Sequence, residues 1–164
     1  MVTRRAAAGF TLIELMIVIA IVGLMLVLGA PLTRAWVVST QLHDAQAQIG
    51  QAYARGKAMA LRNPGGVSDS LAATIVCLSG TTLSLYAASD SNTAAACSGT
   101  ATWSTEIADS VSVQAPSGTA FTCVAFDNRS RAISASASDG GNSCSTGNGF
   151  TLTKESGTVT AAYY

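Results

Sequence analysis

The chain has 164 residues, of which nine are basic and nine acidic, so its formal net charge at pH 7 is zero. If an apolar N-terminal segment is set aside, about 130 residues remain, which is enough for one domain with a modest core. Beyond Arg34 six basic residues face eight acidic ones, and no overall positive charge draws that part to nucleic acid or anionic lipid.

The first predicted element is an apolar helix that begins near Phe10. No residue from Leu15 to Leu32 is charged, and a helix of that length spans roughly 27 Å, close to the hydrocarbon thickness of a bilayer. We therefore expect residues 10–34 to form a transmembrane helix. Glu14 is the one carboxylate in the run. It either has a function at membrane depth or lies at the edge of the span, where headgroups solvate it.

The segment before the apolar run is short and basic. Arg4 and Arg5 predict that the N-terminus stays in the cytoplasm and that the rest of the chain lies outside. An ordinary secretory signal is cleaved after a small-x-small site, but here a proline follows directly in Gly29-Ala30-Pro31. Loss of the whole apolar run by conventional signal cleavage is therefore the less favoured fate.

The residues Gly9-Phe10-Thr11-Leu12-Ile13-Glu14-Leu15-Met16, which follow this basic leader, resemble the type IV prepilin signature. The resemblance implies that a prepilin peptidase in the membrane removes residues 1–9 by cutting between Gly9 and Phe10, and that Phe10 is then N-methylated. It also implies that Glu14 of one subunit meets the new Phe10 amine of its neighbour, since a buried carboxylate is tolerated beside a cation.

Further partners and locations follow from the same resemblance. The subunit is expected in the bacterial inner membrane before assembly, where the prepilin peptidase acts on it. It is then expected in a periplasmic or extracellular pilus, where it contacts other pilin subunits through its N-terminal helix.

The helical pattern continues beyond the apolar run. Apolar residues recur at spacings of three and four between Leu42 and Ala60, and Asn63-Pro64-Gly65-Gly66 predicts the end of the helix. We expect residues 35–63 to form an amphipathic half that packs on a globular domain. Gly23 and Pro31 predict a kink or break in the first half, and the resemblance implies that the helix between them is unwound in assembled pili.

After Gly66 the pattern changes to short runs typical of β-strands. The runs Thr74–Leu78 and Thr82–Tyr86, separated by Ser79-Gly80-Thr81, predict a hairpin. The predicted fold class is α+β, a pilin fold with a long N-terminal helix on a mainly antiparallel β domain at residues 64–164. Further strands are predicted at residues 111–113, 120–126, 131–137, 150–154 and 158–163, with polar loops at 87–100 and 138–149.

Four cysteines, Cys77, Cys97, Cys123 and Cys144, lie in this β-rich part. An even number downstream of an export-type segment predicts disulfides in an oxidising compartment. Three pairings are open. Joining neighbours, Cys77 to Cys97 and Cys123 to Cys144, is preferred because each bond closes a short loop, worth about 3 kcal/mol in the chain-entropy model. No pair has CxxC spacing and His43 lies far upstream, so no metal site is predicted.

Two later segments resemble the GspH/FimT group, namely Ala52–Asn63 at the helix end and Phe126–Arg131. That group contains minor pilins of the FimT and FimU types and minor pseudopilins of type II secretion. We expect a structural minor pilin that assembles into or primes a type IV pilus for adhesion, motility or DNA uptake. A minor pseudopilin of type II secretion is the alternative.

A DNA-binding pilin for natural transformation is a second alternative. Some FimT-type pilins bind DNA through a C-terminal Gly-Arg-x-Arg motif, but here Gly157-Thr158-Val159-Thr160 lacks both arginines. Arg129 and Arg131 are the weak candidates that remain. DNA is therefore a possible partner that is not favoured, because no basic strip interleaved with aromatic residues supports it.

An enzyme is not predicted. His43 lies among glutamines without a triad partner nearby in sequence, the carboxylates are scattered, and the glycines lie in turns and loops. No catalytic residue and no cofactor are therefore expected.

Overall fold

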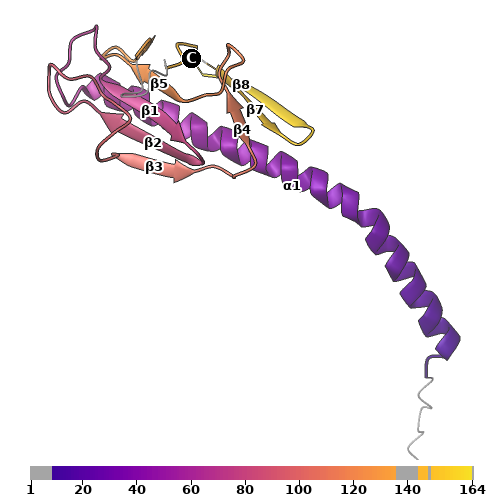
Figure 1. Cartoon of the computed structure of the whole chain (residues 1–164). Helices are drawn as coiled ribbons and strands as arrows, with labels where there is room; N and C mark the ends of the chain where they lie inside the picture. Colours follow the sequence, from indigo (N-terminus) through magenta and orange to yellow (C-terminus); the bar gives the residue numbers. More distant parts are fainter. Residues whose placement is uncertain (1–8, 136–143, 148, 164) are drawn as a thin grey trace, which may run out of the picture. The chain divides into compact units, whose positions relative to one another are not determined.

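The computed structural model describes residues 9–135, 144–147 and 149–163, without the side chains of residues 28 and 30–32. In this part of the chain one long helix is followed by short strands (Figure 1). The chain divides into two compact units, with the boundary between Val37 and Val38.

Helix α1 runs from Leu12 to Arg62. Its end confirms the prediction: Asn63 takes a left-handed conformation with φ of 43°, its backbone N–H donates to the carbonyl of Met59 at 3.1 Å, and a proline follows. The backbone of the single chain is helical through both Gly23 and Pro31, and unwinding between them in assembled pili stays a prediction. A proline removes one hydrogen bond of the helix and costs about 3 kcal/mol, which a long helix tolerates through its other bonds.

A five-stranded antiparallel sheet forms the larger β layer, in the order β3-β2-β1-β5-β6. The predicted hairpin is its centre, and Gly80 takes the left-handed conformation, with φ of 59°, in the turn. The strands of this sheet are β1 (Thr74–Ser79), β2 (Thr82–Ala87), β3 (Trp103–Glu106), β5 (Cys123–Phe126) and β6 (Ala132–Ile133).

A second antiparallel sheet has three strands in the order β4-β7-β8. They are β4 (Ser112–Gln114), β7 (Gly149–Lys154) and β8 (Gly157–Ala162). The last two form the predicted C-terminal hairpin, with Lys154 opposite Gly157 across the turn.

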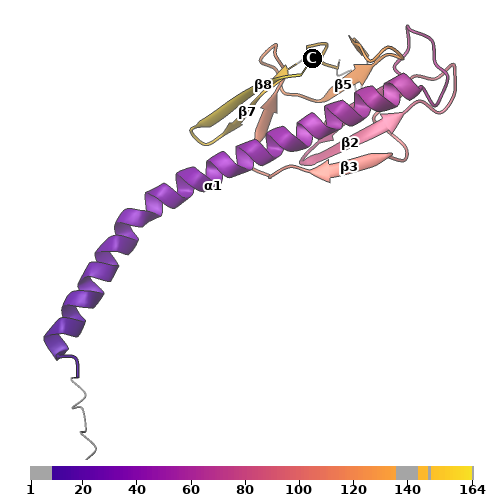
Figure 2. The same ribbon diagram turned by 180° about the vertical axis from the view of Figure 1, so that it is seen from behind.

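The second half of α1 packs on both sheets, and Figure 2 shows it in front of them. Gly56 lies so close to the larger sheet that an added Cβ would be 3.0 Å from the Phe126 ring and 3.1 Å from Val76. The buried ring of Tyr53 contacts Phe126 of β5 and Phe150 of β7, with centroid distances of 5.6 and 5.8 Å. One helix face therefore joins the two sheets, and the helix, the antiparallel sheets and the disulfides match the expected pilin fold.

The two disulfides join Cys77 to Cys97 and Cys123 to Cys144. This is the preferred of the three pairings that the sequence left open. Each bond ties a residue outside the described strands, Cys97 or Cys144, to the five-stranded sheet.

Two predicted strands differ from the observed ones, and one observed strand was not predicted. The run 120–126 begins as a strand only at Cys123, because Ala120 bridges instead to Gln114 of β4 in the other sheet. The run 131–137 is reduced to Ala132–Ile133, and its residues 136–137 lie outside the described part. Strand β3 was not predicted, since its four residues carry no period-two pattern of apolar side chains.

Candidate functional site

The expected peptidase site lies just before the helix. Gly9, Phe10 and Thr11 are not helical, and α1 begins at Leu12. Phe10 is 85 % exposed, so the bond between Gly9 and Phe10 is in irregular, accessible backbone. The expected leader comprises residues 1–9. Of these, only Gly9 belongs to the described part of the chain.

The first turn of α1 is capped by Thr11. Its hydroxyl accepts a hydrogen bond from the backbone N–H of Glu14 at 3.3 Å, and its carbonyl accepts one from Leu15 at 3.2 Å. A threonine followed three residues later by glutamate is the sequence signal of a capping box, so the pattern that reveals Thr11 was present in the sequence. A carboxylate in the first turn also interacts favourably with the helix dipole.

The carboxylate of Glu14 is exposed and, among the described residues, has no ion-pair partner. The hydrogen bond of the cap uses its backbone N–H and leaves the side chain oxygens uncommitted. Glu14 can therefore accept a cation from outside its own chain.

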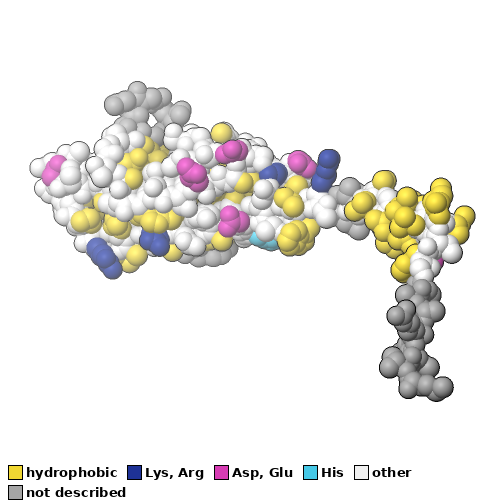
Figure 3. Space-filling view, turned by 90° about the horizontal axis from the view of Figure 1, so that it is seen from below, with side chains coloured by type: hydrophobic (Ala, Val, Ile, Leu, Met, Phe, Trp, Pro, Cys, Tyr) yellow, Lys and Arg dark blue, Asp and Glu magenta, His cyan; other side chains and the backbone are white. Residues whose placement is uncertain are grey.

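Large apolar side chains surround the helix from its start to Val27. Figure 3 shows part of this apolar surface from one side, and each of the side chains is 49–78 % exposed. A helix that is apolar on every side is stable only where lipid or other protein covers it. Residues 10–34 were expected to cross a membrane, but no helix in the described residues is long and apolar enough to do so. The exposed side chains are Leu12, Ile13, Leu15, Met16, Ile17, Val18, Ile19, Ile21, Val22, Leu24, Met25, Leu26 and Val27.

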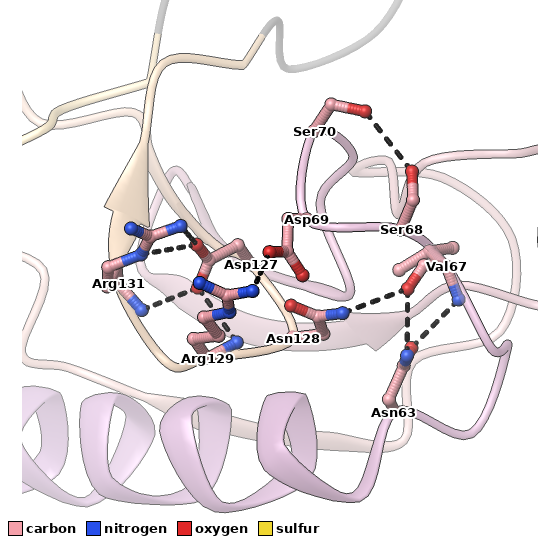
Figure 4. A network of polar contacts seen from close by, with 9 residues as sticks. All are labelled: Asn63, Val67, Ser68, Asp69, Ser70, Asp127, Asn128, Arg129 and Arg131. Carbon is pink, nitrogen blue, oxygen red and sulfur yellow. Dashed lines mark hydrogen bonds and ion pairs between the residues drawn. The ribbon is translucent and has the colours of Figure 1, made fainter.

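The DNA-binding candidates lie in the turn between β5 and β6, which Figure 4 shows from close by. The carboxylate of Asp127 is fully buried and accepts the backbone N–H groups of Arg129 at 2.9 Å and Arg131 at 2.8 Å. Its second oxygen accepts Nε of Arg131 at 2.7 Å, and Arg129 pairs with Asp69. Each candidate arginine is thus paired with an aspartate of its own chain.

The pKa of Asp127 reflects this arrangement. Burial by itself raises the pKa of the carboxyl group, but the hydrogen bonds from Arg131 and Arg129 outweigh burial, so the pKa lies below its usual value. The buried charge is therefore kept ionised, and the turn is rigidly held by it.

The same turn is tied to the end of α1. Asn128 donates from its side chain to the carbonyl of Val67 at 3.2 Å, and Asn63 donates to that carbonyl at 2.8 Å. Asn63 also accepts the backbone N–H of Val67 at 3.0 Å. This network holds the helix end against the β domain. In the described residues no group of His, Cys, Asp and Glu side chains is placed to hold a metal ion.

Comparison with known proteins identifies the N-terminal signature. The sequence model of the prokaryotic N-terminal methylation motif matches residues 4–30. The chain therefore carries the prepilin signature, and signature and fold together are consistent with a type IV pilin-like protein. This signature implies processing by a prepilin peptidase and assembly with other pilins. Searches of the curated proteins and of the solved structures found no match.

Proposed function

We propose that this chain is a minor pilin of the FimT/FimU type that assembles into, or primes, a type IV pilus used for adhesion, motility or DNA uptake. The observation that carries the proposal is the exposed apolar surface of α1 from Leu15 to Val27, which lies within the prepilin signature at residues 4–30. Such a surface needs a cover, and helices of the same kind in a filament supply one.

In this proposal the peptidase cuts between Gly9 and Phe10, and the amine of Phe10 is then methylated. The exposure of Phe10 and the irregular backbone before Leu12 support access to the bond. Before assembly the segment 10–34 holds the subunit in the inner membrane with the N-terminus in the cytoplasm. The support for this step is the prepilin motif itself.

In the same proposal, Glu14 favours a subunit that is correctly docked in the filament over one that is not. Its carboxylate has no ion-pair partner in the described chain, so moving it into an apolar filament core is costly unless a cation meets it. The ammonium group of Phe10 in a neighbouring subunit is such a cation. A subunit that docks out of register leaves both charges unpaired and is disfavoured.

DNA binding is not part of the proposal. Arg129 and Arg131 each carry an aspartate partner, Asp69 and Asp127, so the turn has no net positive charge from these four residues. Phosphate binding would have to compete with both ion pairs.

The test uses Glu14→Ala in the native host, with pili sheared from the cells and probed for the subunit. We expect normal removal of the leader, seen as the mature mass with one added methyl group, but loss of the subunit from the sheared pili. Glu155→Ala, in the exposed turn between β7 and β8, is the control and should be incorporated normally. Incorporation of the Glu14→Ala variant at the control level would refute the assembly role of Glu14.

A strain from which the gene for this chain is deleted distinguishes a role in a type IV pilus from a role in type II secretion. Loss or reduction of surface pili with unchanged protein secretion supports the pilus. Intact pili with loss of secreted enzymes from the medium would instead support the pseudopilin of type II secretion.

A further inference from the structure

The two disulfides are anchored at positions that face each other across two strands. Cys77 in β1 and Cys123 in β5 are direct partners in the antiparallel register. Cys77 is bonded to Cys97 and Cys123 to Cys144. Two separate disulfides therefore begin from one cross-strand pair.

The hydrogen bonds define what kind of pair this is. The N–H of Leu78 donates to the carbonyl of Thr122 at 2.8 Å, one position along both strands. The carbonyl of Cys123 accepts instead from Ser145 at 2.8 Å. Because hydrogen-bonded and non-hydrogen-bonded pairs alternate, Cys77 and Cys123 form a non-hydrogen-bonded pair, in which the Cα atoms are typically about 4.5 Å apart. That separation lies within the range of disulfides.

Both side chains also lie on the same face of the sheet. Val76 and Phe126 face α1, where they meet Gly56, so the period of two places Cys77 and Cys123 on the opposite face. Their disulfide partners, Cys97 and Cys144, therefore bond to them from that face.

The four cysteines differ in access. Cys97 is partly exposed, whereas Cys77, Cys123 and Cys144 are 6, 0 and 5 % exposed. A reductant therefore reaches the Cys97 sulfur first. Attack on that sulfur releases Cys77 as the leaving thiolate, directly opposite Cys123.

We propose that Cys77 and Cys123 are a thiol–disulfide exchange pair that passes the reduction of one disulfide on to the other. A dithiol reductant attacks Cys97, becomes oxidised to its own disulfide, and leaves Cys77 and Cys97 as thiols. The Cys77 thiolate attacks Sγ of Cys123, so the Cys77–Cys123 bond forms and the Cys123–Cys144 bond breaks. Cys144 leaves as a thiolate and takes up a proton. The exchange step is redox-neutral.

The consequence is a redox-sensitive release of two segments by one two-electron reduction. Cys97 and Cys144 both end as thiols, and both lose their covalent tie to the sheet. The new Cys77–Cys123 bond keeps β1 and β5 joined.

The first test is limited reduction of the full-length protein in detergent with less than one equivalent of dithiothreitol, followed by alkylation of all thiols. Trypsin alone cannot separate three of the cysteines, because no Lys or Arg lies between Arg62 and Arg129. Chymotrypsin separates them after Tyr86, Trp103 and Phe121. We expect a peptide that links Cys77 to Cys123, with Cys97 and Cys144 alkylated. Alkylation of Cys77 and Cys97 alone would overturn the proposal.

Two variants give a matched comparison, since both remove the same disulfide. Cys97→Ser leaves a thiol at Cys77, opposite Cys123, whereas Cys77→Ser leaves it at Cys97, which has no such partner. We expect alkylation of Cys144 to be at least about tenfold higher in Cys97→Ser than in Cys77→Ser. Equal, low alkylation of Cys144 in both variants would contradict exchange. If Cys97→Ser does not fold, the limited reduction of the unaltered protein decides alone.

Discussion

The backbone N–H of Glu14 donates a hydrogen bond to the hydroxyl of Thr11, 3.3 Å away, in the first turn of α1. Two residues of this turn thus have separate tasks. Thr11 satisfies a helix donor that would otherwise lack a partner. The carboxylate of Glu14 stays uncommitted, as the proposed pairing with a neighbouring subunit requires. The start of the helix is thereby fixed close to the expected new N-terminus at Phe10.

Replacing Thr11 with alanine should fray this first turn. Loss of an N-cap threonine costs about 1 kcal/mol, so the amides of Glu14 and Leu15 should exchange with solvent roughly fivefold faster. Amide exchange of the protein in detergent micelles, followed by NMR, measures the change. Thr11→Ser keeps the hydroxyl and should exchange like the unaltered protein. Unchanged exchange in Thr11→Ala would show that the hydroxyl does not support the turn.

Replacing Asp127 with asparagine should lower stability at neutral pH. The buried carboxylate accepts two N–H groups and an arginine side chain, and hydrogen bonds to a charged group are worth roughly 1.5–3 kcal/mol. Denaturant unfolding at pH 7, followed by tryptophan fluorescence, measures the loss. Asp69→Asn removes the exposed pair with Arg129 and should cost less than about 1 kcal/mol.

The pH dependence of this effect has a definite sign. The pKa of Asp127 is lowered in the folded protein, so its contribution is present above the unfolded value of about 3.9 and is lost as the pH falls through the folded pKa. The difference between the unaltered protein and Asp127→Asn should therefore shrink as the pH is lowered below about 4. A difference that grows on acidification would be inconsistent with a lowered pKa.

Local rules predicted much of the fold. Asn63 and Pro64 marked the helix end, and Gly80 marked the hairpin turn, because each acts through its own backbone. The sequence could not reveal that Cys77 faces Cys123, since that register depends on two strands 46 positions apart in the chain. The helix continues through Pro31 in the single chain because the remaining hydrogen bonds of α1 outweigh the local cost of the proline.

For the candidate site, the sequence predicted some features and missed others. The roles of Glu14 and of the cleavage position followed from the signature and stay predictions, whereas the cap at Thr11 was missed although its motif was visible. The pairing of Arg131 with Asp127 was within reach of the sequence, since the two are four residues apart. The pairing of Arg129 with Asp69 could not be predicted from the sequence, because it joins the β5–β6 turn to the segment after α1.

Two glycines of α1 should respond differently to alanine. At Gly56 an added Cβ meets the buried Phe126 ring at 3.0 Å and Val76 at 3.1 Å, and neither can move without disturbing the core. Overpacking costs about 1–3 kcal/mol, which exceeds the gain in helix propensity of about 1 kcal/mol. At Gly50 the close atoms are the hydroxyl and ring of Tyr163, at 3.0 and 3.1 Å. Moving this side chain weakens its hydrogen bond at a cost of about 1 kcal/mol, which the gain in helix propensity of about 1 kcal/mol offsets.

Thermal unfolding of Gly56→Ala and Gly50→Ala tests this difference. We expect a lower midpoint for Gly56→Ala and a midpoint within a few degrees of the unaltered protein for Gly50→Ala. Equal midpoints would mean that the helix can move away from the larger sheet at little cost.

Tyr163, which directly follows β8, should contribute to stability through both its ring and its hydroxyl. The ring stacks on Phe150 with a centroid distance of 5.1 Å and contacts Tyr53 at 5.4 Å, and the hydroxyl donates to the carbonyl of Gln46 at 2.9 Å. Tyr163→Phe should cost about 1 kcal/mol, because it removes one hydrogen bond. Tyr163→Ala should cost about 3 kcal/mol, because it also exposes the rings of Tyr53 and Phe150. Denaturant unfolding of both variants measures the two parts separately, and an equal loss in both would assign the whole contribution to the hydroxyl.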